Sequence, residues 1–154
     1  MFTTYKVLLT LHILAAVIWV GGGATIQLLA LRVVRSKSAE RLAGFSRDVA
    51  EIGMRVYLPA SIVIIVTGGW LVSDGSWGFG KAWVTIGLSV WLISALAGTF
   101  YLGPTSKKIA EAIEREGVES TRAQALIAGI FRYSRIELAL LVTVVCDMVL
   151  KPGA

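Results

Sequence analysis

The chain has 154 residues, of which 56% are hydrophobic and only 16% are charged, and its formal net charge is +5. Soluble domains carry about 25% charged residues, and so small a globule cannot bury this much apolar surface. The composition therefore predicts an integral membrane protein. The high apolar content excludes a disordered chain. The single cysteine forms no internal disulfide, which excludes a secreted disulfide scaffold. Basic residues of a membrane protein first report its orientation, so we expect no nucleic-acid partner.

Four apolar stretches predict four membrane-spanning helices. They cover residues 7–31, 57–72, 82–102 and 136–150. A spanning helix needs about 20 apolar residues, within a range of about 17–25. The first and third stretches meet this length, and the shorter second and fourth each continue a helical pattern on one side. The sequence thus predicts an all-α fold. We expect one transmembrane domain over residues 1–154, a four-helix bundle whose helices extend into the cytoplasm.

The two long connections between the spans are amphipathic, at residues 38–56 and 105–135. Apolar residues recur in them at helical spacing. Ser38 is placed to cap the helix of the first connection, and Ser120 or Thr121 to cap the fourth helix. Pro59 lies inside the second helix and is expected to kink it. Residues 105–116 are expected to form a short amphipathic helix that Gly117 closes.

Basic residues set the predicted orientation. Twelve of the 15 Lys and Arg side chains lie in the two long connections, and the other three are Lys6, Lys81 and Lys151. By the positive-inside rule the long connections face the cytoplasm. Both termini and the loop at residues 73–80 then face outward, with Trp77 and Trp83 as an aromatic belt. We expect a multi-pass protein of a bacterial inner membrane, surrounded by lipid, with a second copy or another membrane protein as candidate partners.

Polar groups inside hydrocarbon are costly and mark candidate sites. The intramembrane ones are His12, Gln27, Glu137 and Asp147, with Arg32 and Arg55 at the inner boundary. His12 is the single histidine. It is expected either to ligate haem iron or copper or relay protons, or simply to bond a neighbouring helix. Met148 is a candidate second ligand, and Asp147 is placed to fix the tautomer of the imidazole. Zinc, which takes three or four protein ligands, is not expected.

The remaining charged groups each have a structural and a functional interpretation. Asp147 and Lys151 are spaced i, i+4, which suits an ion pair on the outer rim, with a proton-relay role as the alternative. Glu137 is expected in a charge cluster at the inner interface, or at a site for porphyrin propionates, which arginines bind in bidentate fashion. The arginines of that interface are Arg32, Arg55, Arg132 and Arg135.

Small residues cluster within the predicted spans. They are Gly21, Gly22, Gly23, Gly68, Gly69, Gly87 and the Ser94–Gly98 pair. Small residues let helices pack closely, and the same gap can admit a flat cofactor. Trp19 and Trp91 lie at mid-span, where they either line a porphyrin pocket or fill the bundle core.

Several motifs are similar to those of a known superfamily. Residues 12–22 read HILAAVIWVGG, residues 55–60 read RVYLPA, and the last helix carries Phe131-Arg132 and Glu137 and ends in Lys151-Pro152. In these respects the chain resembles the CopD-like and HemJ-like superfamily of small bacterial four-helix integral membrane proteins, whose function is largely unassigned. The lysine of helix three and the Asn-Glu-x-Pro motif of HemJ have no counterpart here.

The resemblance implies a membrane four-helix fold and, for the HemJ-like branch, oxidation of protoporphyrinogen IX with haem b bound through His12. For the CopD-like branch it implies a copper-related role. The residues that we expect around a haem are His12, Met148, Trp19, Arg55 and Arg132. The favoured hypothesis is a haem- or porphyrin-binding membrane protein with a redox or porphyrinogen-oxidase-like role. The alternatives are a cofactor-free membrane subunit and a copper-related protein, so enzyme and non-enzyme interpretations both stand.

Overall fold

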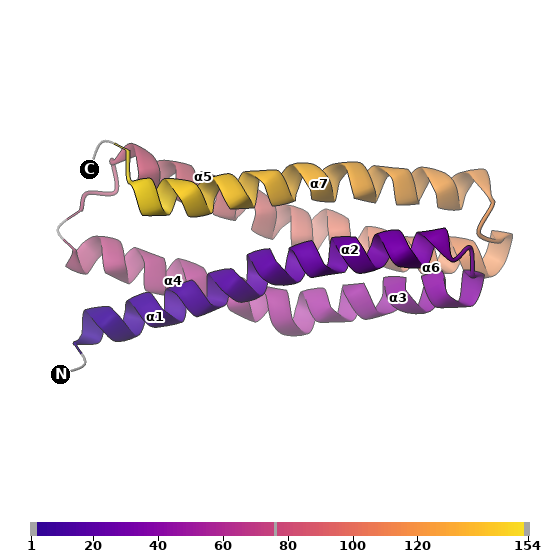
Figure 1. Ribbon diagram of the computed structural model, residues 1–154, viewed down its shortest axis with the longest axis horizontal. Helices are drawn as coiled ribbons and strands as arrows, with labels where there is room; N and C mark the ends of the chain where they lie inside the picture. Colours follow the sequence, from indigo (N-terminus) through magenta and orange to yellow (C-terminus); the bar gives the residue numbers. More distant parts are fainter. Residues whose placement is uncertain (1–2, 76, 153–154) are drawn as a thin grey trace.

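In the computed structural model the chain folds into four long helices that lie side by side (Figure 1). The structure describes residues 3–75 and 77–152. Short connections join the helices, so neighbours in sequence run antiparallel. The two termini lie at the same end of the bundle as the connection between α4 and α5 (Figure 1).

The first three helices each contain one π-helical turn and continue through it without a break. The first helix consists of α1 (Thr4–Ala16), η1 (Val17–Gly21) and α2 (Gly22–Arg35). The second consists of α3 (Ala39–Ile52), η2 (Gly53–Tyr57) and α4 (Leu58–Asp74). The third consists of α5 (Ala82–Ala97), η3 (Gly98–Leu102) and α6 (Gly103–Glu116). The fourth helix is α7 (Thr121–Leu150), which is α-helical throughout.

The helices close into a bundle because each one contacts two neighbours. α1 packs against α4 and α3 against α6, while α5 and α6 both pack against α7. α2 completes the ring through its contacts with α3 and α7. The predicted all-α four-helix bundle is confirmed.

The amphipathic connections are continuations of the apolar helices. The expected short helix at residues 105–116 is not separate: it is the last part of the third helix, Ala82–Glu116. The second helix likewise runs from α3 through η2 into α4. Pro59 lies in the first turn of α4, directly after η2. Proline has no backbone N–H and therefore cannot make the hydrogen bond that a helix normally has at its position. The π-turn before it changes which carbonyls are paired, so the helix continues past Pro59.

The predicted helix ends are confirmed by their capping geometry. The hydroxyl of Ser38 accepts a hydrogen bond from the Arg41 amide at 3.3 Å. At the start of α7 the cap is Ser120, whose hydroxyl accepts from the Ala123 amide at 3.2 Å. Gly117 follows α6 with φ at 86°, a conformation that disfavours residues with a side chain.

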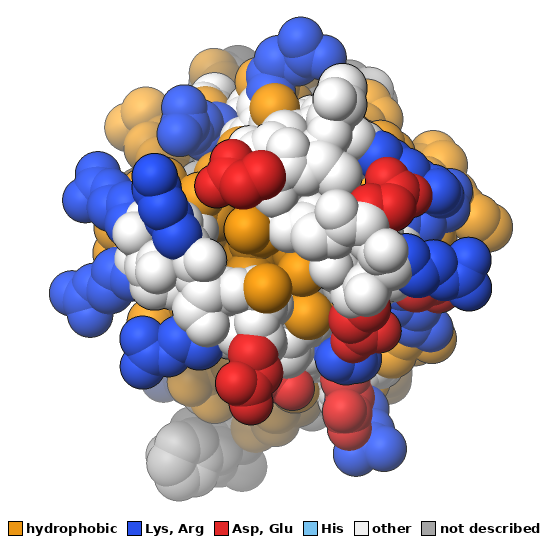
Figure 2. Space-filling view, turned by 90° about the vertical axis from the view of Figure 1, so that its right-hand side faces the viewer, with side chains coloured by type: hydrophobic (Ala, Val, Ile, Leu, Met, Phe, Trp, Pro, Cys, Tyr) orange, Lys and Arg blue, Asp and Glu red, His pale blue; other side chains and the backbone are white. Residues whose placement is uncertain are grey.

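One half of the bundle, which we call the basic end, has a dense core. It contains α2, α3, α6 and the start of α7, and charged side chains surround its tip (Figure 2). The buried cluster of this end consists of Leu42, Ala43, Ile109, Ala110, Ala112, Ile113, Ala123 and Ile127. Small residues dominate the contact between α3 and α6, so the two backbones approach closely. An ion pair between Arg47 and Glu114 bridges the same two helices at the surface.

The other half, which we call the apolar half, contains α1, α4, α5 and the end of α7. Many large hydrophobic side chains are exposed there: Phe100, at its border with the basic end, is 74% exposed, and Val149 and Leu150 are 76% and 77% exposed. The first three helices are each long and apolar enough to cross a membrane. The described helix α7 is not among these candidate spans, and its last 18 residues include Arg135, Glu137 and Asp147. The exposed apolar surface suits a solvent of lipid chains.

Candidate functional site

The four helices line a partly open cavity of about 460 Å³ near the middle of the bundle and towards the basic end. Every helix contributes to its wall. Most of the lining is aliphatic or small, and four aromatic side chains contribute to it: Trp19, Phe45, Tyr57 and Phe131. The polar groups that reach it include Gln27 and Glu137, together with several hydroxyls. Such a mainly apolar space with a few polar groups is typical of small-molecule sites.

All three π-helical turns border this cavity. Trp19 from η1, Tyr57 from η2 and Thr99 from η3 belong to its lining. π-helical turns inside α-helices are frequent at functional sites, because they widen the helix and change its backbone pairing. Three such turns around one space are therefore an independent indication that the space is used.

Sequence reasoning missed the π-turns, although a signal was available. Both η2 and η3 begin at a glycine that precedes a proline by six residues: Gly53 with Pro59, and Gly98 with Pro104. The glycine eases the distortion and the proline lacks the amide that a regular helix needs at that position. The repeated spacing indicates a local change of helix type at both places.

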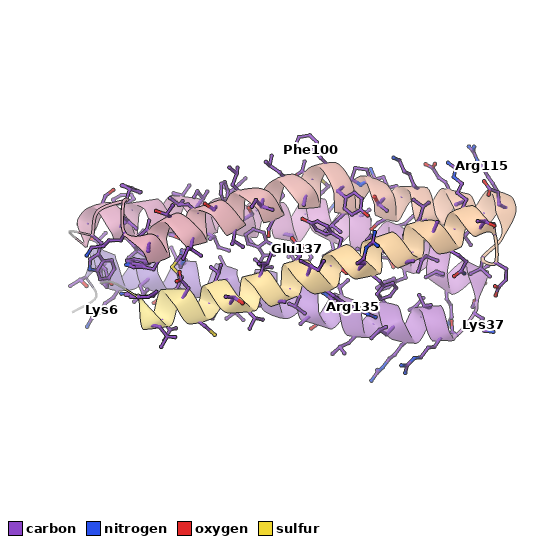
Figure 3. All side chains as sticks on the ribbon, turned by 90° about the horizontal axis from the view of Figure 1, so that it is seen from above. Lys6, Lys37, Phe100, Arg115, Arg135 and Glu137 are labelled. Carbon is purple, nitrogen blue, oxygen red and sulfur yellow. The ribbon has the colours of Figure 1, made fainter. Side chains whose placement is uncertain are left out.

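Glu137 points from α7 towards the other helices, whereas Phe100 points away from the bundle (Figure 3). The carboxylate is half-buried and lines the cavity. The hydroxyl of Ser94, on α5, is its hydrogen-bonding neighbour. Ser94 is only 2% exposed, so the carboxylate meets a buried partner in the wall of the cavity.

The expected arginine cluster around Glu137 is not formed. Arg55 instead pairs with Glu51 at 2.7 Å on the surface. The guanidinium of Arg135 lies over the Phe131 ring, 5.9 Å from its centroid. The ion pairs that join described residues are Arg47–Glu114, Arg55–Glu51 and Arg122–Glu116. The four arginines of the predicted cluster are exposed, whereas Glu137 is half-buried at the cavity.

Two hydrogen bonds fix other polar groups at the cavity wall. The Gln27 amide nitrogen donates to the carbonyl of Ser134 at 2.6 Å, which ties α2 to α7. The Trp91 indole donates to Ser61, at 3.0 Å to its hydroxyl and 3.1 Å to its carbonyl. Trp91 therefore joins α5 to α4, and both serines belong to the lining.

His12 lies outside the cavity lining, at the crossing of α1 and α4. Its Nδ1 is 3.1 Å from the Ile64 carbonyl oxygen and 3.1 Å from the Thr67 hydroxyl oxygen. The Thr67 hydroxyl donates to the Val63 carbonyl at 2.6 Å. This network assigns the proton to Nδ1, which donates to Ile64, and leaves Nε2 with the lone pair. A Cβ on Gly68 would be 3.0 Å from the ring carbon Cε1, so a larger residue there would force the ring to shift by a few tenths of an ångström.

Met148 lies against a different helix. Its methyl group occupies the space that a Cβ on Gly87 would take. It packs with Trp83 and Val84 of α5. The structure thus brings Met148 to α5 and His12 to α4.

The predicted pair of Asp147 and Lys151 is not among the ion pairs that join described residues. The ammonium of Lys151 instead lies over the Trp77 ring, 3.7 Å from its centroid. One carboxylate oxygen of Asp147 and the indole nitrogen of Trp83 are buried without a hydrogen-bond partner. The indole rings at this end therefore replace Asp147 as the neighbour of the Lys151 cation.

A haem held by the whole predicted set would need those residues around one space. Of the five, Trp19 lines the cavity, whereas His12, Met148, Arg55 and Arg132 do not. Arg55 precedes Ile64, the partner of His12, by nine residues, or about 14 Å along the helix. The structure therefore does not gather these five residues around one space. In residues 3–75 and 77–152 there is also no group of three or more His, Cys, Asp or Glu side chains able to hold a metal ion.

Comparison with known proteins agrees with this picture of a membrane bundle. No curated protein and no solved structure matches the chain. One family does match, over residues 6–152, a range that includes the three π-turns and the whole cavity lining. The chain is thus an integral membrane protein and belongs to the family described as predicted integral membrane protein (DUF2269).

Proposed function

We propose that this membrane protein binds a small, mainly apolar ligand in the cavity between its four helices. The observation that carries the proposal is the cavity itself, about 460 Å³ in volume and walled by all four helices. Ligand sites in proteins measure about 300–1,000 Å³ and combine an apolar lining with few polar groups. The three π-turns support the proposal, because they border the same space.

Filling the cavity tests this function. Gly23 lines the cavity and a Cβ there meets nothing within 4 Å, so Gly23→Phe places a ring in the cavity without a backbone clash. Gly69 is an equally open glycine outside the lining, and Gly69→Phe is the matched control. The probe is 1-naphthalenemethanol, added to protein in phosphatidylcholine nanodiscs and detected by native mass spectrometry.

We expect one saturable probe per chain in the wild type and in Gly69→Phe. Gly23→Phe should weaken binding by about tenfold or more, which corresponds to about 1.4 kcal/mol. Equal binding by both variants, or binding that never saturates, would contradict the proposed function.

Haem b at His12 is the second candidate function. The hydrogen bond from Nδ1 to the Ile64 carbonyl favours it. When one ring nitrogen of a histidine ligates a metal, the N–H of the other ring nitrogen commonly donates a hydrogen bond of this kind. His12 would then be the axial ligand, and the bound group would supply redox chemistry. A detergent-purified sample from cells given haem precursor should show a Soret band that shifts on dithionite reduction and is lost in His12→Ala. A flat visible spectrum would exclude haem binding, and a chelator-sensitive colour without a Soret band would favour the copper-related alternative.

The basic end is proposed to face the cytoplasm, with both termini outside. The bias of twelve basic residues to three supports this orientation. Single cysteines at Lys6 and Lys37, in a Cys146→Ser background, test it. An impermeant maleimide should label Lys6→Cys but not Lys37→Cys in spheroplasts, and the reverse labelling would invert the assignment.

A further inference from the structure

We infer that the ligand of this cavity is a lipophilic cation whose positively charged nitrogen lies at Glu137. The inference rests on the proposed function, because it names the ligand class of the same site. It starts from a carboxylate that reaches an apolar cavity from the middle of α7. A carboxylate in such surroundings is costly to keep charged unless a cation compensates it.

The protein itself supplies no such cation among its described residues. The ion pairs that join described residues all involve other carboxylates. Lys107 also lines the cavity, but it follows Ser94 by thirteen residues, or about 20 Å along the third helix. Since Ser94 is the partner of Glu137, the ammonium of Lys107 belongs to the other end of the cavity. A complementary charge at Glu137 has to come from the ligand.

The remaining wall suits the rest of such a molecule. Aromatic rings of Trp19, Tyr57 and Phe131 line the cavity, and ring faces attract organic cations as well as apolar groups. The turn η1, which carries Trp19, contacts α7. An amine or quaternary ammonium on a compact hydrocarbon or aromatic body matches this combination of one carboxylate and an apolar lining.

A pair of probes of equal size tests the charge preference. The cationic probe is 1-naphthalenemethylamine, and the neutral probe is the alcohol of the same skeleton, 1-naphthalenemethanol. Binding is measured in nanodiscs of phosphatidylcholine, a lipid without net charge, with empty nanodiscs as the background. Glu137→Gln removes the charge and keeps the shape of the side chain. Glu51→Gln removes a surface carboxylate that already has Arg55 as its partner, and Glu137→Asp retains the charge if Glu137→Gln fails to fold.

We expect the wild type to bind the amine about tenfold more tightly than the alcohol, because only the ammonium adds the attraction between opposite charges to its hydrogen bond with the carboxylate. Glu137→Gln should bind both probes equally, whereas Glu51→Gln and Glu137→Asp should keep the preference. The trimethylammonium derivative should also exceed the alcohol, which would show that charge rather than N–H donation decides.

The outcomes separate the two proposals. If the alcohol binds saturably but the amine gains nothing, the charge inference is overturned and the apolar site stands. If neither probe binds, the proposed function itself fails. A preference for the amine that survives in Glu137→Gln would place the charge contact elsewhere and overturn the assignment to Glu137.

Discussion

The basic end and the apolar half of the bundle use the same helices in opposite ways. At the basic end alanines meet across α3, α6 and α7, and Ala43, Ala110 and Ala123 are 3%, 2% and 0% exposed. In the apolar half the large side chains point outward, and Val66, Ile93 and Ile136 are 58%, 55% and 57% exposed. Each of the first three helices therefore has a section packed on small side chains at the basic end and a section with exposed large side chains in the apolar half.

The difference follows from the surroundings. In water a helix gains stability when its apolar face is buried, so the amphipathic basic end packs its small residues inward. In lipid the tails are as apolar as leucine, and helix association relies on close packing and hydrogen bonds. The apolar half accordingly relies on Gly68 against His12, Gly87 against Met148, and the bond from Trp91 to Ser61. The cavity and the π-turns that border it lie between the basic end and the apolar half.

The largest loss of stability is expected from a charge introduced into the core of the basic end. Ala110→Asp introduces a carboxylate into the contact of α6 with α3, where the wild-type residue is 2% exposed. We expect a loss of about 3–5 kcal/mol in the free energy of unfolding, since an unpaired buried charge is strongly destabilising. Ala125→Asp, at an exposed position of α7, is the control and should be close to neutral. Thermal unfolding followed by circular dichroism in micelles measures both, and similar losses would refute the packed core.

The same isoleucine-to-alanine truncation, made once at the basic end and once in the apolar half, compares the packing of the two parts directly. Ile113→Ala removes a side chain that is 4% exposed in the core of the basic end, and we expect a loss of about 2–5 kcal/mol. Ile93→Ala removes one that is 55% exposed in the apolar half. There most of the side chain is outside the packed core, so we expect a change below about 0.5 kcal/mol. A large effect of Ile93→Ala would show that a partner, and not lipid, covers that face.

The fold was largely predictable, because helical periodicity and apolar runs act along single segments. Local sequence patterns determine the four helices and their ends. These ends include the N-caps at Ser38 and Ser120 and the end of α6 at Gly117. The continuity of the second helix past Pro59 was expected, whereas that of the third helix was not. Residues 105–116 were expected to form a separate short helix, but η3 carries the third helix past Pro104.

The candidate site was less predictable, because it depends on how the helices are rotated about their axes. Intramembrane polarity singled out Glu137 and Gln27, and both line the cavity. Spacing along the chain could not show that His12 faces α4 and Met148 faces α5. The i, i+4 spacing of Asp147 and Lys151 likewise gave no hint of the tryptophans that lie closer to the lysine.

Adjacent glycines of α4 test how closely the apolar half is packed. A methyl group on Gly68 would lie 3.0 Å from the His12 ring, whereas one on Gly69 meets nothing within 4 Å. Alanine favours a helix over glycine by about 1 kcal/mol, so Gly69→Ala should be neutral or stabilising. Gly68→Ala should be less stable than Gly69→Ala by about 1–3 kcal/mol, because it overpacks the crossing of α1 and α4. Thermal unfolding of the two variants, compared directly, checks this, and equal stability would mean that His12 moves freely.

The smallest effect is expected from the surface ion pairs of the basic end. Arg47 and Glu114 join α3 to α6, but their side chains are 55% and 47% exposed. Exposed pairs of this kind contribute about 0.2–1 kcal/mol, because water and salt screen them. A double-mutant cycle with Arg47→Ala and Glu114→Ala should therefore give a coupling energy in that range, which falls further at high salt. If the coupling instead exceeded about 2 kcal/mol, charge pairing would rival the alanine contacts beneath it. The contrast between the two halves would then lie in their electrostatics as much as in their packing.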